Sequence, residues 1–209
     1  DIDIFFFFSE DGETSGPRVR DHGDYFTRLT QQLAKSLDAL TVDGFVARVD
    51  QRLRPWGSAG QLAIPVVACE DYYEVHGREW ERFALLKARP VAGDRDLGTN
   101  LLHSLKPFMY RKYLDFGVFE SIRDLKSKIE TEVRRNGRDQ NVKVGRGGIR
   151  EIEFIVQSMQ LLRGGQIPTL QVTGFLEALS ALVDESILTA DDGRQLREDY
   201  LWLRLVEHV

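Results

Sequence analysis

The feature that most constrains the fold is a change of periodicity near Gly93. Before this point, residues 1–8 and 45–53 show the alternating or clustered apolar side chains of half-buried strands, separated by loops rich in Gly, Pro and charge. After it, apolar residues recur at the spacing of amphipathic helices. The sequence therefore predicts an α+β fold, with a mixed β-sheet and helices in residues 1–92 and an all-helical domain in residues 93–209.

Apolar spacing also predicts the individual helices. The first is expected over residues 25–40, with its apolar residues at the spacing of one helix face: Phe26, Leu29, Leu33, Leu37 and Leu40. A second should begin at Pro65 and run to about His76, because proline suits the first helical turn. Ala88–Val91 is expected to return to the sheet. Further helices are expected around 80–87, up to Asn136, over 149–162, over 173–185 and from 189 onward.

Composition excludes several classes of protein. No apolar run reaches the roughly 18 residues of a membrane helix, and the net charge of −5 gives no overall attraction to nucleic acid or anionic membranes. Cys69 is the single cysteine of the chain, so no intrachain disulfide can form, and a reducing compartment, the cytoplasm, is expected. Nothing near Cys69 would activate a thiol, which predicts a packing role.

Three carboxylates are candidate metal ligands. Asp1 and Asp3 flank Ile2 on a predicted strand, so both side chains point to the same face. Two carboxylates about 4 Å apart would repel by roughly 4 kcal/mol at an effective dielectric of 20, which favours a cation between them. Asp50 lies on the second strand, and hard oxygen ligands of this kind suit Mg²⁺. The alternative is that the first pair belongs to a solvated turn.

The face that carries Asp50 also carries arginines at alternating positions: Arg48, Arg52 and Arg54. Guanidinium groups bind phosphate in a bidentate way, so Arg52 and Arg54 are candidate phosphate or nucleotide contacts. An alternating Arg/Asp face is also typical of a solvated ion-pair surface. Trp56, between Pro55 and Gly57, is a candidate wall of the same cleft.

A second candidate phosphate site is the glycine-rich turn Lys143–Gly148, which leads directly into a helix. Free amides at a helix N-terminus attract phosphate, and Lys143, Arg146 and Arg150 add positive charge around Gly147 and Gly148. The alternative is an ordinary connecting turn. Beyond it, a polar stripe faces either a cleft or water: Arg150, Glu153, Gln157 and Gln160.

Four segments together resemble one enzyme family in order and spacing: Asp1–Ile4, residues 45–57 (FVARVDQRLRPWG), 80–89 (WERFALLKAR) and 143–157 (KVGRGGIREIEFIVQ). The family is the bifunctional glutamine synthetase adenylyltransferase/adenylyl-removing enzymes, and the resemblance extends over essentially the whole chain. It implies a nucleotidyltransferase fold, Mg²⁺-dependent chemistry on an adenylylated tyrosine of glutamine synthetase, and control by the PII signalling protein. It also implies that a Gly-Gly or Gly-Ser turn should precede the first aspartates, and this sequence does not include one.

The same resemblance distinguishes the two halves of the family's long polypeptide. Trp80–Arg82, Gly147–Gln157 and Arg163–Gly165 are similar to the amino-terminal, adenylyl-removing half. That half is implied to catalyse phosphorolysis, in which inorganic phosphate attacks the adenylyl phosphorus and releases ADP. Asp1, Asp3 and Asp50 would be its catalytic, metal-binding residues.

Three other hypotheses stay open at this point. The chain could be the adenylylating half, which uses ATP and the same carboxylates. It could instead be a scaffold that binds PII or glutamine synthetase without turnover, although three carboxylates on strand faces argue against that. A relative of nucleic-acid polymerases is disfavoured, because template binding calls for a basic channel.

Overall fold

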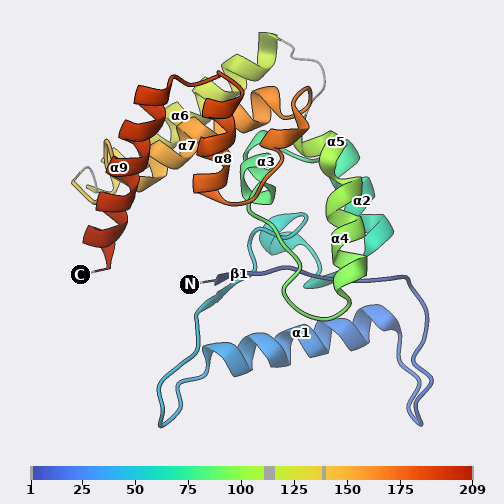
Figure 1. Ribbon diagram of the computed structural model, residues 1–209. Coiled ribbons are helices and arrows are strands. Elements are labelled where there is room, and N and C mark those ends of the chain that lie inside the picture. Colours follow the sequence, from blue (N-terminus) through green and yellow to red (C-terminus); the bar gives the residue numbers. More distant parts are fainter. Residues whose placement is uncertain (1, 111–115, 138–139, 209) are drawn as a thin grey trace. The chain divides into compact units, whose positions relative to one another are not determined.

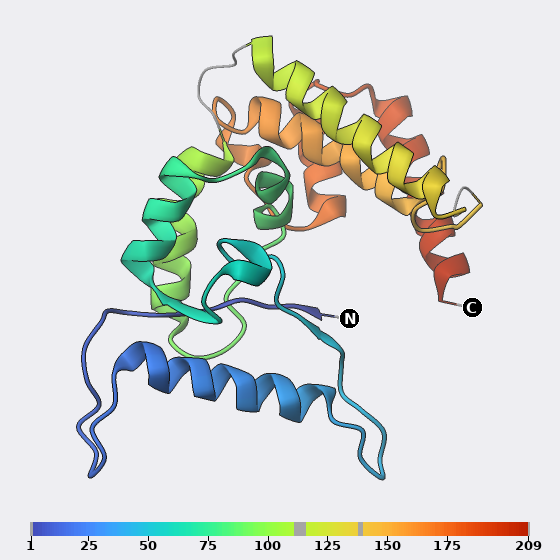
Figure 2. The ribbon, with the colours of Figure 1, turned by 180° about the vertical axis from the view of Figure 1, so that it is seen from behind.

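The computed structural model describes residues 2–110, 116–137 and 140–208 of the chain (Figures 1 and 2). These residues form short parallel strand pairs in the first part and helices through the rest. The predicted α+β class is therefore confirmed. No helix within the described ranges is both long enough and apolar enough to span a bilayer.

The backbone forms two compact units that interleave in sequence. One unit contains Asp1–Arg78 and Val91–Leu105, and the other contains Glu79–Pro90 and Lys106–Val209. The chain thus leaves the first unit, forms a short part of the second, returns, and then completes the second. A domain boundary near Gly93 stays a prediction. The compact units change at Arg78, at Pro90 and at Leu105, so they do not correspond to a single division of the chain.

Two parallel strand pairs form the sheet structure of the first unit. Strand β1 (Ile2–Asp3) pairs with β3 (Val49–Asp50), and β2 (Phe6–Phe8) pairs with β4 (Ala63–Pro65). Both pairs are parallel, whereas we predicted a mixed sheet, and antiparallel pairing among the described residues is limited to isolated bridges. The predicted strand over 45–53 is shorter than expected, since among the described residues the strand contains Val49 and Asp50 alone.

Helix α1 (His22–Asp38) packs against β2, β3 and β4 and lies alongside the N-terminal strands (Figures 1 and 2). Asp21 caps it, its side chain accepting a hydrogen bond from the Asp24 amide (3.2 Å). On its inner side Thr30 is buried, and Phe26 stacks on Phe8 with ring centroids 4.9 Å apart.

The apolar face predicted for α1 is only partly buried. Leu29 is 46% exposed, Leu33 is 41% exposed, and Leu40, beyond the helix, is 82% exposed. A helix of 17 residues extends about 25 Å, whereas a three-residue strand extends about 10 Å. The apolar face of α1 is therefore longer than the strands that can cover it.

The rest of the first unit packs against β2 and β4 through one of its helices, α2 (Val66–Val75). It also contains the 3₁₀ turn η1 (Gly57–Ala59) and the helix α4 (Arg95–Ser104). α2 matches the predicted second helix, and it contributes Cys69, which is fully buried. Burial raises the pKa of this thiol to about 12, so the predicted packing role is confirmed.

The regular secondary structure of the second unit is helical throughout its described residues. Helix α7 is central, since it contacts α3, α8 and α9. Its core joins Val156 to buried residues of η2 and α8: Leu170, Ala178, Leu179 and Leu182. The elements of the unit are α3 (Glu79–Leu85), α5 (Lys106–Met109), α6 (Phe116–Arg135), α7 (Ile149–Arg163), η2 (Pro168–Leu170), α8 (Phe175–Asp184) and α9 (Ala190–Glu207).

The helices predicted for the second part form close to their expected bounds. α7 ends at Gly164, and Thr189 caps α9, its side chain accepting from the Asp192 amide. The strand expected at Ala88–Val91 does not form.

Replacing the fully buried Leu182 by alanine should lower the free energy of unfolding by about 2–5 kcal/mol, because it removes apolar contacts and leaves a cavity. The matched change Leu205→Ala, at a side chain that is 66% exposed, should cost less than about 0.5 kcal/mol. Urea unfolding followed by circular dichroism measures both. Equal effects would contradict this account of the core.

Candidate functional site

The site begins with the parallel register of β1 and β3. Ile2 pairs with Val49 and Asp3 with Asp50, and backbone hydrogen bonds from Ile2 N to Arg48 O and from Ile4 N to Asp50 O hold the pairing (both 2.9 Å). Partners in register project to the same face of a sheet, so the carboxylates of Asp3 and Asp50 share a face. Asp1, the third predicted ligand, lies outside the described residues.

Arg52 surrounds the Asp50 carboxylate with donors. Its Nε donates to Oδ1 (3.0 Å) and to Oδ2 (2.9 Å), its Nη2 donates to Oδ2 (2.5 Å), and its backbone amide donates to Oδ1 (2.8 Å). These hydrogen bonds, the side-chain ones most strongly, lower the pKa of Asp50 from 3.8 to about 2. Asp50 is therefore ionised at neutral pH, which is the state a metal ligand requires.

The carboxylate oxygens of Asp3 and Asp50 are ligands that suit a hard divalent cation. Asp3 and Asp50 offer carboxylate oxygens on neighbouring strands, the ligand type that Mg²⁺ prefers. Within the described residues no group of three His, Cys, Asp or Glu side chains could hold a metal ion, and Asp1 is not among those residues. Two of the three predicted ligands are thus brought together, and the third is untested.

Arg54 has a different role from the one predicted. Its side chain is buried, and it donates to three backbone carbonyls: Gln51 O (2.8 Å), Gly60 O (3.1 Å) and Ser58 O (3.3 Å). With its nitrogens engaged in this way, Arg54 holds the 51–60 loop rather than presenting a phosphate contact. The alternation that placed it beside Arg52 ends because the strand stops at Asp50.

Trp56 lies on the loop that Arg54 holds. Its backbone is left-handed (φ 64°), which is uncommon for a bulky residue, and its side chain is 55% exposed. The indole packs against His76 and Tyr72, with centroids 4.6 and 4.9 Å away. Gly60 allows this arrangement, because a Cβ there would lie 2.0 Å from the Pro55 carbonyl oxygen. Trp56 is thus a fixed aromatic surface of the first unit, and its place in a cleft stays a prediction.

The glycine turn before α7 is closed by its own backbone. The amides of Ile149 and Arg150 donate to Val142 O and Lys143 O, Gly148 N donates to Gly145 O, and Gly147 N donates to the Glu151 carboxylate (2.7 Å). These four amides, which belong to the predicted phosphate site, already have acceptors. This corrects the expectation of an anion cradle and favours the alternative of a connecting turn.

The cations around this turn are in different situations. Arg146 and Arg150 are exposed, so their side chains remain candidates for anion contacts. Lys143 forms an ion pair with Glu207 (3.3 Å), and Glu207 also binds Arg204 (2.6 Å). Lys143 is therefore partly neutralised by α9.

The two long motifs of the second unit pack on each other. Phe83 of α3 stacks on Phe154 of α7, with centroids 5.0 Å apart and planes 3° apart. Lys87 pairs with Glu153 (2.9 Å), which also accepts from the Tyr200 hydroxyl (3.5 Å). Glu153, predicted to line a cleft, thus links α7 to α9 and to the turn that follows α3.

Sequence reasoning missed two buried charged residues of α3, Glu81 and Arg82. Arg82 donates to the Phe108 carbonyl, lies over the Phe108 ring (4.4 Å) and pairs with Glu79 (3.3 Å). It therefore ties α3 to α5. The only available signal was their place in the 80–89 motif, and an amphipathic pattern does not predict buried charge.

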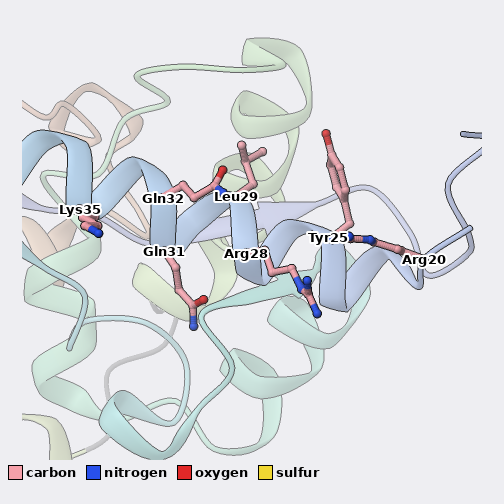
Figure 3. Close-up of a pocket in the computed structure, with 7 residues that line it drawn as sticks. All are labelled: Arg20, Tyr25, Arg28, Leu29, Gln31, Gln32 and Lys35. Atoms are coloured by element: carbon pink, nitrogen blue, oxygen red, sulfur yellow. The ribbon is translucent and has the colours of Figure 1, made fainter. Parts of the chain in front are cut away.

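A hollow of about 730 Å³ follows α1, lined by Arg20, Tyr25, Arg28, Leu29, Gln31, Gln32 and Lys35 (Figure 3). Tyr25 and Leu29 extend from one side of the helix and Arg28 and Gln31 from the other, so the hollow follows a helix surface. None of the predicted site residues lines it. The chemistry of the carboxylates therefore belongs elsewhere on this unit.

Known proteins match the whole chain. It is 55% identical over 210 residues to the bifunctional glutamine synthetase adenylyltransferase/adenylyl-removing enzyme of Hahella chejuensis, and 51% and 50% identical to those of Pseudomonas putida and Pseudomonas aeruginosa. Each match covers 100% of this chain. The chain belongs to this enzyme family.

Family sequence models divide the chain in two. Residues 1–104 match glutamate–ammonia ligase adenylyltransferase, and residues 123–209 match GlnD PII-uridylyltransferase. The chain spans about a fifth of the length of the relatives named above (21–22%). The Asp3–Asp50 pair lies within the residues that match the adenylyltransferase family model.

The ion pair of Asp50 predicts a pH-dependent stability difference between the parent chain and Arg52→Gln. A carboxyl whose pKa is lowered to about 2 in the folded state adds stability above its ordinary pKa, and this is lost as pH falls toward about 2. Arg52→Gln should therefore be less stable than the parent at pH 6, and the difference should shrink between pH 4 and pH 2. Urea unfolding across this range measures it, and a constant difference would contradict the assignment.

The closed glycine turn predicts the effect of adding one methyl group. A Cβ at Gly148 would lie 2.6 Å from Val142 O and 2.9 Å from Gly145 O, so Gly148→Ala should destabilise by about 1–3 kcal/mol. Gly16, which has no neighbouring atom within 4 Å, provides the control, and its alanine variant should change stability by less than about 0.5 kcal/mol. Thermal unfolding distinguishes the two, and a neutral Gly148→Ala would reopen the phosphate-cradle hypothesis.

Proposed function

We propose that this chain supplies the catalytic carboxylates for removing AMP from the adenylylated tyrosine of glutamine synthetase. The observation that carries the proposal is the in-register pair Asp3–Asp50 in a chain of this enzyme family. The names of the relatives state two activities, adenylyl transfer and adenylyl removal. The motifs at 80–82, 147–157 and 163–165 are similar to the removing half, which favours removal for this chain.

The proposed reaction is phosphorolysis. An oxygen of inorganic phosphate attacks the adenylyl phosphorus, the bond from phosphorus to the tyrosine oxygen breaks, and ADP leaves. The phenolate then takes a proton from solvent to give free tyrosine. Phosphate is already a competent nucleophile, so the reaction needs charge neutralisation and alignment more than a strong general base.

Asp3 and Asp50, with Asp1 as a further proposed ligand, would hold Mg²⁺, which when bound would neutralise charge on the phosphoryl oxygens. Asp50 is well suited to this role because it stays ionised far below neutral pH. Arg52, whose side chain is 80% exposed, is the proposed phosphate contact of the first unit. Arg146 and Arg150 are proposed as further anion contacts because both are exposed.

Adenylylated glutamine synthetase, inorganic phosphate and PII are the proposed partners, and the cytoplasm is the proposed location. The buried, inert thiol of Cys69 is compatible with a reducing compartment. PII is proposed as a partner because the family resemblance implies control by this signalling protein.

The test measures ADP release from adenylylated glutamine synthetase by the complete natural polypeptide that carries these residues, with and without phosphate and uridylylated PII. Asp3→Asn and Asp50→Asn should each lower phosphate-dependent ADP release roughly 100-fold or more, because charge stabilisation at phosphorus is lost. Asp38→Asn, an exposed carboxylate at the end of α1, should leave the rate unchanged.

A second assay on the same variants separates the two activities of the family. ATP-dependent transfer of AMP onto unmodified glutamine synthetase should survive both substitutions if another domain performs it. Loss of that transfer with intact ADP release would assign this chain to adenylylation. Retention of both activities, with unchanged binding to glutamine synthetase, would favour a scaffold.

A further inference from the structure

The Asp50 carboxylate forms an ion pair with Arg52, which follows two residues later, just after the end of β3. An ionised carboxylate has about four acceptor positions, two on each oxygen. In this structure Oδ1 accepts from Arg52 Nε and from the Arg52 backbone amide, and Oδ2 accepts from Arg52 Nε and Nη2. All four positions are used by one residue.

Three of these four contacts can be released and one cannot. The backbone amide of Arg52 is fixed by the chain, so it holds Asp50 whatever the side chain does. The guanidinium contacts depend on a side chain that is 80% exposed, whereas the Asp50 side chain is 25% exposed. A cation that binds Asp50 would therefore displace the guanidinium and leave the carboxylate oriented.

The negative charge of Asp3 also stabilises the charged form of Arg52. The pKa of Arg52 is raised mainly by its hydrogen bonds to Asp50 and by the charge of Asp50, with a further contribution from Asp3. The guanidinium thus neutralises the negative charge of the same strand face on which Asp3 and Asp50 lie in register.

We propose that Arg52 competes with the divalent cation for Asp50 and thereby sets the cation affinity of this site. The inference rests on the proposed function, since it takes Asp50 as a metal ligand. Binding of the cation releases the guanidinium, which then faces solvent and the substrate phosphates instead of a carboxylate. Arg52 is in this sense an affinity-determining residue, in addition to any contact it makes with phosphate.

The experiment measures Mn²⁺ binding to the complete natural polypeptide by calorimetry and by the electron paramagnetic resonance signal of free Mn²⁺. The site is defined as the Mn²⁺ binding that Asp50→Asn removes. Arg52→Gln should bind Mn²⁺ at this site roughly two- to fivefold more tightly than the parent, the range set by an exposed ion pair. Asp50 is the last residue of β3 and Arg52 is an exposed residue just after it, so circular dichroism checks the fold of both variants.

Arg52→Lys is the matched control, because it keeps the charge but cannot make the forked contact. It should also bind Mn²⁺ more tightly than the parent, by less than Arg52→Gln. If the Mn²⁺ affinity rises in Arg52→Gln but is unchanged in Arg52→Lys, the effect is due to net charge. That result would overturn the proposal that the Arg52 guanidinium competes with the cation.

Two further results separate this inference from the proposed function. If Asp50→Asn removes a Mn²⁺ site but neither Arg52 variant changes its affinity, only the inference on Arg52 fails. If Asp50→Asn removes no site, the metal assignment fails and the competition fails with it.

Discussion

The candidate site depends on the pairing of β1 with β3, in which two described residues of each strand are in register. Backbone hydrogen bonds from Ile2 and Ile4 to the β3 segment set the register that places Asp3 opposite Asp50. A shift of one residue would turn every side chain of a strand to the other face, so the carboxylates would no longer share one. The pairing of β2 with β4 and the packing of α1 against β2, β3 and β4 make such a shift costly, because they anchor the same extended segment.

Sequence periodicity predicted the helices well because a repeat near 3.6 residues depends on local backbone geometry alone. It did less well on what each face contacts. On α1, Leu29 and Leu33 belong to the apolar repeat and are still exposed, because the strands beneath are too short to cover the helix. Coverage depends on the length of a neighbour far away in sequence, and a local pattern does not contain that information.

The candidate site shows the same limit. Asp3 and Asp50 were predictable because side-chain alternation and a family resemblance agreed on them. Arg52 and Arg54 looked equivalent in sequence, yet one surrounds a carboxylate and the other binds three carbonyls inside a loop. The strand ends at Asp50, and beyond that point alternation no longer says where a side chain points. The different roles of Arg52 and Arg54 could therefore be recognised only from the backbone path of residues 51–60.

The glycine turn shows why a specific motif need not be a chemical site. Gly148 is required because carbonyl oxygens lie where its Cβ would stand, and Gly147 has a left-handed backbone (φ 71°). The Gly147 amide, which was expected to bind phosphate, donates to Glu151 instead. In the helix that follows, Ile149, Ile152 and Val156 are buried and Phe154 stacks on Phe83. Much of the sequence that identifies the family thus maintains the packing of α3 against α7. The proposed chemistry of the first unit would depend on far fewer residues. Among these are Asp50 and Arg52, and a single substitution at Arg52 would shift the proposed competition between its guanidinium and a cation for the Asp50 carboxylate.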